Sequence, residues 1–166
     1  MAYALFVSPD DIVKRTAISG NVDRDQMVQY IKTSQDIHIQ ALLGTALYDK
    51  LKNDVLANTL TGNYLTLMND YVQDVLVHYT MVELLPFLTY KVSNGGVFKK
   101  QSENSESIDK SELEYLIQKE RDTAEHYGRR LVNYLTFYGN LTPEYYANQN
   151  GEMYPTDGQS FHGWYL

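Results

Sequence analysis

The feature that most constrains the fold is a long stretch that is apolar on every side. Apolar residues recur at helical spacing from Leu65 to Val82, and between Val77 and Leu88 the opposite face is apolar as well. A helix that is apolar all round is usually buried at the centre of a bundle, because no side of it favours water. The stretch is too short to span a bilayer and contains His78 and Glu83. We therefore predict a central, buried helix.

Residues that start and stop helices mark further helices around this one. Helical spacing also runs through residues 27–42 and 113–138, and Pro86 predicts that the central helix kinks or ends near Leu85. The predicted boundary residues are the N-caps Ser8 and Asp23, the terminating Gly44 with a new start at Thr45, the capping-box pair Ser111 and Glu114, and the terminating Gly95 and Gly139.

These segments together predict an all-α protein. We expect a helical bundle of about four to five helices with a kinked long central helix, spanning residues 1–141, followed by an extended C-terminal arm, residues 142–166. Gly, Asn and Pro prevent a helix after Ala147, and the aromatic residues there argue against a freely solvated tail. The sequence therefore predicts an arm that packs on something.

Composition narrows the function classes. The chain has 166 residues, which suits one domain, and no cysteine, which excludes a disulfide scaffold and a Cys nucleophile. Its net charge is −7, so the chain as a whole lacks the basic character typical of nucleic-acid binding, and it is poorly suited to anionic membranes.

No catalytic constellation emerges. The four histidines form no H-E-x-x-H or Glu-x-x-His pattern, and the Gly-rich stretch at 93–96 lacks the phosphate-loop lysine. Glu83 is expected to pair with Lys91 or Arg130, or to face a subunit boundary, because buried charges need partners. We predict no catalytic, metal or cofactor site, and hence no enzyme. The enzymatic alternative would use Glu83, His78 and tyrosines at the bundle centre.

Aromatic residues supply the candidate interaction sites. Tyrosine occurs 15 times, and it suits surfaces that become buried against partners. Within the arm, the expected anchors are Tyr145, Tyr146, Tyr154, Phe161, Trp164 and Tyr165. A second candidate contact is the loop from Asn94 to Ser107, which is expected to order on binding; with the adjoining extended segment it contributes Asn94, Gly95, Gly96 and Phe98.

Three segments together resemble a known family. They are the turn Leu43–Leu51 (LGTALYDKL), the glycine loop Val92–Val97 (VSNGGV), and the last helix from Arg121 to Leu135 (RDTAEHYGRRLVNYL). This arrangement, over about residues 20–140, is similar to head–tail connector (adaptor) proteins of tailed phages, particularly of crAss-like phages.

The resemblance implies a structural virion protein, assembled in the host cytoplasm into the neck of the particle. It implies a ring of copies of this chain, commonly twelve, beneath the portal protein and next to further neck or tail proteins, with double-stranded DNA passing through the lumen and no membrane involved. The alternative is a cytosolic helical protein-binding module that uses the aromatic C-terminal arm against a single partner.

Overall fold

The computed structural model describes residues 3–93, 96–99, 108–147 and 152–156, with only the backbone for residues 91–93 and 96–99. Helices dominate it, in agreement with the predicted all-α class. The chain forms α1 (Pro9–Arg15), α2 (Arg24–Ser34), α3 (Gln40–Leu43), α4 (Thr45–Ala57), α5 (Gly62–Leu67), α6 (Gln73–Thr89) and α7 (Lys110–Phe137). π-Helical turns make α2 continuous with α3, through η1 (Gln35–Ile39), and α5 continuous with α6, through η2 (Met68–Val72).

A hairpin and two 3-10 turns are the remaining regular elements of the described chain. An antiparallel hairpin of β1 (Tyr90–Ser93) and β2 (Gly96–Lys99) follows α6, with Ser93 opposite Gly96. The extended segment expected after the glycines is therefore a strand. Two 3-10 turns, η3 (Gly139–Leu141) and η4 (Pro143–Tyr145), follow α7.

Most predicted helix boundaries are confirmed. The Ser8 side chain accepts a hydrogen bond from the Asp11 N–H in a complete capping box, and the Asp23 side chain caps α2. Gly44 ends α3 at φ +74°, a backbone conformation that favours glycine. The predicted cap of the last helix is wrong by two residues: Asp109 with Glu112 forms the capping box, not Ser111 with Glu114.

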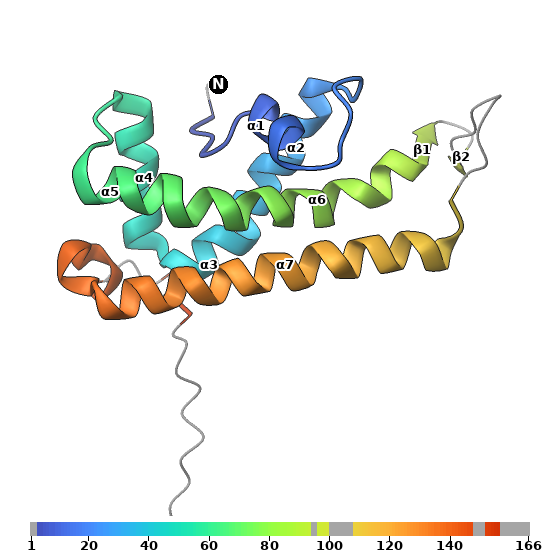
Figure 1. The fold of residues 1–166 in the computed structure, drawn as a ribbon. Helices are drawn as coiled ribbons and strands as arrows, with labels where there is room; N and C mark the ends of the chain where they lie inside the picture. Colours follow the sequence, from blue (N-terminus) through green and yellow to red (C-terminus); the bar gives the residue numbers. More distant parts are fainter. Residues whose placement is uncertain (1–2, 94–95, 100–107, 148–151, 157–166) are drawn as a thin grey trace, which may run out of the picture.

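Pro86 does not end the central helix, which continues to Thr89. Proline removes one backbone hydrogen bond but leaves the preceding turn intact, so a helix can continue past it when its sides are packed. The last turns of α6 bend away from the start of α7 toward β1 (Figure 1). This geometry fits the predicted kink and leaves the start of α7 less covered than its middle.

The core lies where α6 is enclosed by the other helices. In Figure 1, α6 and α7 run side by side, and α2 and α4 cross on the other side of α6. Residues from all these helices are fully buried together, which confirms the central position predicted for the apolar stretch: Ile31, Leu47, Leu51, Val75, Leu76, Leu84, Leu131 and Leu135.

A buried polar network fastens the N-terminal segment to the π-helical turn η1. Gln35 is fully buried; its amide Nε2 donates to the Ala4 carbonyl at 2.8 Å, and its Oε1 accepts from the Phe6 N–H at 3.0 Å. The Tyr48 hydroxyl donates to Asp36 at 2.6 Å. Burial, and then this hydrogen bond, raise the pKa of Tyr48. The network satisfies backbone groups that would otherwise be buried unpaired.

The boundary between body and arm lies later than predicted. Residues 142–147 belong to the helical body, because Tyr145 is only 3% exposed and lies in the main core cluster. The Tyr64 hydroxyl also donates to Glu144 at 2.7 Å, which ties η4 to α5. The expected boundary at residue 141 is therefore corrected to a point beyond residue 147.

Candidate protein-interaction surface

The C-terminal end of α7 carries a cluster of exposed aromatic side chains, which we call the C-end patch: Phe137, Tyr138 and Tyr146. Phe137 is 79% exposed and packs edge-on against Tyr138, with ring centroids 4.8 Å apart. Tyr138 in turn contacts Tyr134, which stacks on Tyr71 at 4.1 Å. The exposed rings are thus supported from beneath by partly buried ones.

Tyr146 is held in place from two sides. Its hydroxyl donates to the Thr136 carbonyl at 3.0 Å. Its ring lies against Gly139 so closely that a Cβ there would come within 1.9 Å of the ring. A rigid, amphipathic aromatic surface of this kind loses little conformational entropy on binding, which favours protein contacts.

The opposite end of α7 carries a second and different apolar surface, which we call the N-end patch: Ile108, Tyr115 and Leu116. Tyr115 is 70% exposed and Leu116 is 43% exposed, and the three side chains border one shallow concavity. Leu116 and Tyr138 both lie at helical spacing within the stretch 113–138, which predicts that they face the core. Both are exposed because the helices packed on α7 do not cover its ends (Figure 1).

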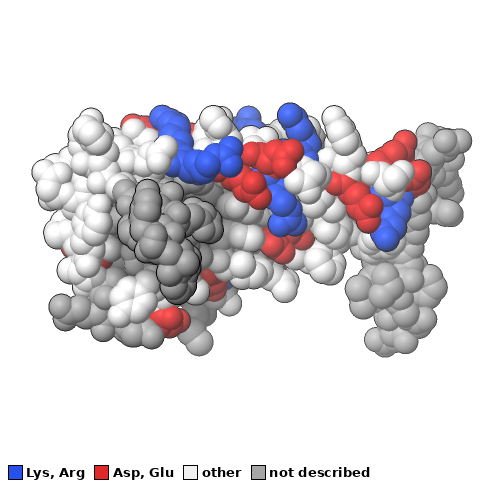
Figure 2. Space-filling model, turned by 90° about the horizontal axis from the view of Figure 1, so that it is seen from below, with Lys and Arg blue, Asp and Glu red and all other residues white. Residues whose placement is uncertain are grey.

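Charge is distributed unevenly along the same face. Figure 2, which views the molecule from the side of α7, shows acidic and basic side chains interspersed over the middle, while the end at left is mostly uncharged. α7 contains five basic and five acidic residues, so it forms no continuous positive stripe of the kind that tracks a phosphate backbone.

The chain returns to the turn between α3 and α4 after it leaves the body. The Thr45 N–H donates to the Met153 carbonyl at 3.0 Å, and the Thr156 N–H donates to the Ala41 carbonyl at 2.9 Å. Pro155 packs on Gly44 so tightly that a Cβ at Gly44 would lie 2.7 Å from the proline ring. Gly44 is therefore required twice, for its positive φ and for this contact.

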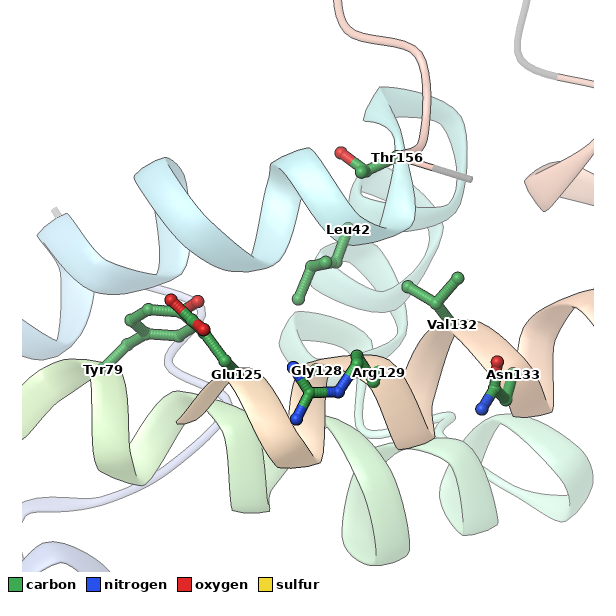
Figure 3. A pocket seen from close by; sticks show the side chains of 8 residues that line it. All are labelled: Leu42, Tyr79, Glu125, Gly128, Arg129, Val132, Asn133 and Thr156. Carbon is green, nitrogen blue, oxygen red and sulfur yellow. The ribbon is translucent and has the colours of Figure 1, made fainter. Parts of the chain in front are cut away.

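A pocket of about 310 Å³ opens beside this returning segment (Figure 3). Leu42 and Val132 point into it from α3 and α7, and Gly128 leaves room at its floor. Its polar residues are Glu125, Arg129 and Asn133 of α7, with Tyr79 of α6 at one side and Thr156 at the rim. Burial, and then the negative charge of Glu125, raise the pKa of Tyr79.

The predicted contact residues divide into four groups. Tyr146 and Tyr154 are exposed, as an anchor must be. Tyr145 is wrong as an anchor for a partner, because its ring is buried in the core of its own protomer. Gly96 and Phe98 lie in β2, where the structure describes the backbone alone, and the remaining predicted contacts lie outside the described residues: Asn94, Gly95, Phe161, Trp164 and Tyr165.

The polar residues considered for an enzymatic site do not come together. Glu83 pairs with His38 at 2.9 Å, which corrects the expectation that it pairs with Lys91 or Arg130. Arg130 lies beside Asp74 instead, and the side chain of Lys91 is not described. His78 points to another face and pairs with Glu120 at 2.7 Å. Among the described residues, no three His, Asp or Glu side chains cluster as metal ligands do.

Each pair joins two helices and is covered by an aromatic ring. The His38 ring stacks on Tyr79 with centroids 3.8 Å apart, and the His78 ring stacks on Tyr127 at 5.5 Å. The pairs connect η1 to α6 and α6 to α7. This arrangement fits a structural role within the bundle.

The fold and its surfaces therefore define a helical bundle with exposed apolar patches at both ends of its longest described helix. No helix within the described residues is both long and apolar enough to cross a membrane. The chain belongs to a family of unknown function, DUF6712, whose model matches residues 39–153. No curated protein and no solved structure matches the chain.

Proposed function

We propose that this protein is a non-enzymatic structural subunit that assembles head-to-tail into a ring, and that the ring is a head–tail connector beneath the portal of a tailed phage. The observation that carries the first part is the presence of two unlike apolar patches at opposite ends of one protomer. The connector assignment adds the resemblance of the turn, glycine loop and last helix to connector proteins. The proposed location is the neck of the virion, with DNA in the lumen.

The separation of the two patches determines how an assembly of this chain would grow. α7 has 28 residues and is about 42 Å long at 1.5 Å per residue, so the two patches are well separated. A contact between two unlike patches is heterologous. It leaves one unused patch at each end of a pair of subunits, so further subunits can add until the rotation between neighbours closes a ring. Large exposed aromatic side chains are the residues that dominate such contacts.

The charge balance supports a conduit for DNA rather than a DNA-binding protein. A net charge of −7 repels phosphates in the aggregate, and the balanced charges of α7 provide no strong attraction. A neck ring has to let the genome slide without holding it. The proposal therefore names copies of this chain, the portal protein and further neck proteins as partners, and gives no catalytic role to any residue.

Cross-linking tests the proposed contact directly, because the natural chain contains no cysteine. The double variant Ser111→Cys/Asn140→Cys places one exposed cysteine beside each patch and leaves the aromatic rings of both patches in place. Oxidised at micromolar concentration, it should give a ladder of covalent multimers on a denaturing gel. Each single-cysteine variant should give no covalent multimer on this gel, because a heterologous contact places unlike residues together. Dimers from a single variant would instead indicate a symmetric contact.

Electron microscopy of the purified protein, with and without portal protein, tests the connector itself. Ring-shaped particles that bind the portal complex are expected. A stable monomer or dimer that does not associate with the portal would favour the single-partner binding module instead.

A further inference from the structure

The pocket between α3 and α7 has no role in the proposed ring, and its position suggests an occupant. It is open to solvent on one side and combines an apolar floor with polar residues at the rim (Figure 3). Protein pockets of this size and lining commonly hold one well-shaped, mostly apolar group that has a small number of polar atoms.

The course of the chain brings a candidate to the rim. Thr156 lines the pocket itself, and its N–H and hydroxyl both bond the Ala41 carbonyl, at 2.9 and 3.0 Å. The ten residues that follow include Phe161, Trp164, Tyr165 and Leu166. A segment that carries three aromatic residues and a leucine thus begins at the edge of a partly apolar pocket.

We propose that this pocket binds the indole side chain of Trp164 of the same chain. The pocket combines apolar contacts from Leu42 and Val132 with acceptor oxygens from Glu125 and Asn133. An indole needs both, because it is a large apolar ring with one N–H donor. A phenylalanine would fill the apolar part of the pocket but has no donor for these oxygens.

Tethering favours the same chain as the donor. Trp164 lies eight positions beyond Thr156, enough for roughly 26 Å of extended chain at about 3.3 Å per residue. A short flexible tether gives an effective concentration in the millimolar range, above that of a second copy in dilute solution. The body of the protein would then hold its own C-terminal segment at a defined place.

Tryptophan fluorescence tests this, because Trp164 is the sole tryptophan of the chain. In the full-length protein we expect emission at a shorter wavelength, and weaker quenching by acrylamide, than in the urea-unfolded chain. A Gly128→Leu substitution fills the pocket and should shift the emission to that of an exposed indole. Gly128→Ala is the matched control: its Cβ would lie 3.7 Å from Leu42, an ordinary contact that leaves the pocket open, so the emission should stay as in the natural chain.

Circular dichroism and thermal melting of both variants establish that the bundle is folded. Exposed-indole emission in the natural protein, or unchanged emission in folded Gly128→Leu, would overturn the proposal. Protection that is lost on dilution would overturn the assignment to the same chain, since it would mean that a second copy supplies the indole. None of these outcomes depends on ring formation, so a failure here would be distinct from a failure of the proposed function.

Discussion

The middle and the ends of α7 differ in how far their apolar side chains are buried. In the middle, apolar residues are fully buried against α6, and polar residues are paired across helices, as His78 is with Glu120. At the ends, Phe137 and Tyr115 are exposed, and Phe137 rests edge-on against the half-exposed ring of Tyr138. The buried residues in the middle of α7 stabilise the fold, and the exposed residues at its ends form surface patches. Substitutions in the two regions should therefore separate stability from association.

The largest effect on stability is expected from the centre. Leu76 is fully buried in α6, so Leu76→Ala removes apolar burial and leaves a cavity. Such substitutions cost about 2–5 kcal/mol. Urea unfolding followed by circular dichroism measures this loss. A change below about 1 kcal/mol would contradict the central position of α6.

A smaller loss is expected at the α3–α4 turn, which joins the body to the returning C-terminal segment. Gly44→Ala imposes a positive φ on alanine and forces Pro155 away, at a cost of about 1–3 kcal/mol. Gly62→Ala is the matched control, because Gly62 has φ +59° but no neighbouring atom within 4 Å.

The two glycine variants separate backbone strain from the Pro155 contact. Hydrogen exchange at the amide of Thr156, which bonds Ala41, should accelerate in Gly44→Ala and stay unchanged in Gly62→Ala. Equal exchange in both variants would mean that the close packing on Gly44 does not hold the segment.

A still smaller effect, and a dependence on pH, are expected where η4 joins the body. Tyr64→Phe removes the hydrogen bond to Glu144 and should cost about 1 kcal/mol at pH 7. Burial, and then the hydrogen bond and charge of Glu144, raise the pKa of Tyr64 to about 12, above the usual 10.

The direction of the pH effect follows from this raised pKa. The folded state keeps the Tyr64 proton more tightly, so its contribution is complete below pH 10 and is lost as the pH rises through about 12. The natural protein should therefore lose stability more steeply above pH 10 than Tyr64→Phe does. Parallel urea midpoints across pH 8–11.5 measure this, and identical slopes would contradict the assignment.

The sequence was sufficient to predict the helical bundle, but it predicted only part of the exposed surfaces. Ser8, Asp23 and Gly44 could be assigned because capping and positive φ are local requirements of the backbone. The start of α7 was placed two residues late because Asp109 with Glu112 and Ser111 with Glu114 fit the same pattern. Periodicity gives the face of a helix but not which part of it a neighbouring helix covers.

The candidate site shows the same limit. Tyr145 and Tyr146 are adjacent in an irregular segment, and no local rule distinguishes the buried ring from the exposed one. The exposed position of Phe137, off the apolar stripe of α7, was a usable signal for the C-end patch. The same signal was present for the N-end patch at Tyr115, which is also off the stripe, whereas Leu116 lies on the stripe and is nonetheless 43% exposed.

Mass photometry of two end variants and their mixture tests the central claim most directly. Tyr115→Ser and Phe137→Ser each remove the most exposed ring of one patch and, as exposed substitutions, should change stability by less than about 0.5 kcal/mol. The natural protein should form a closed ring and each variant should be monomeric. An equimolar mixture should form dimers and nothing larger, because one intact pair of unlike patches remains. His126→Ser, exposed in the middle of α7, is the control and should form rings. Rings from either patch variant, or no dimer in the mixture, would contradict head-to-tail assembly through the ends of α7.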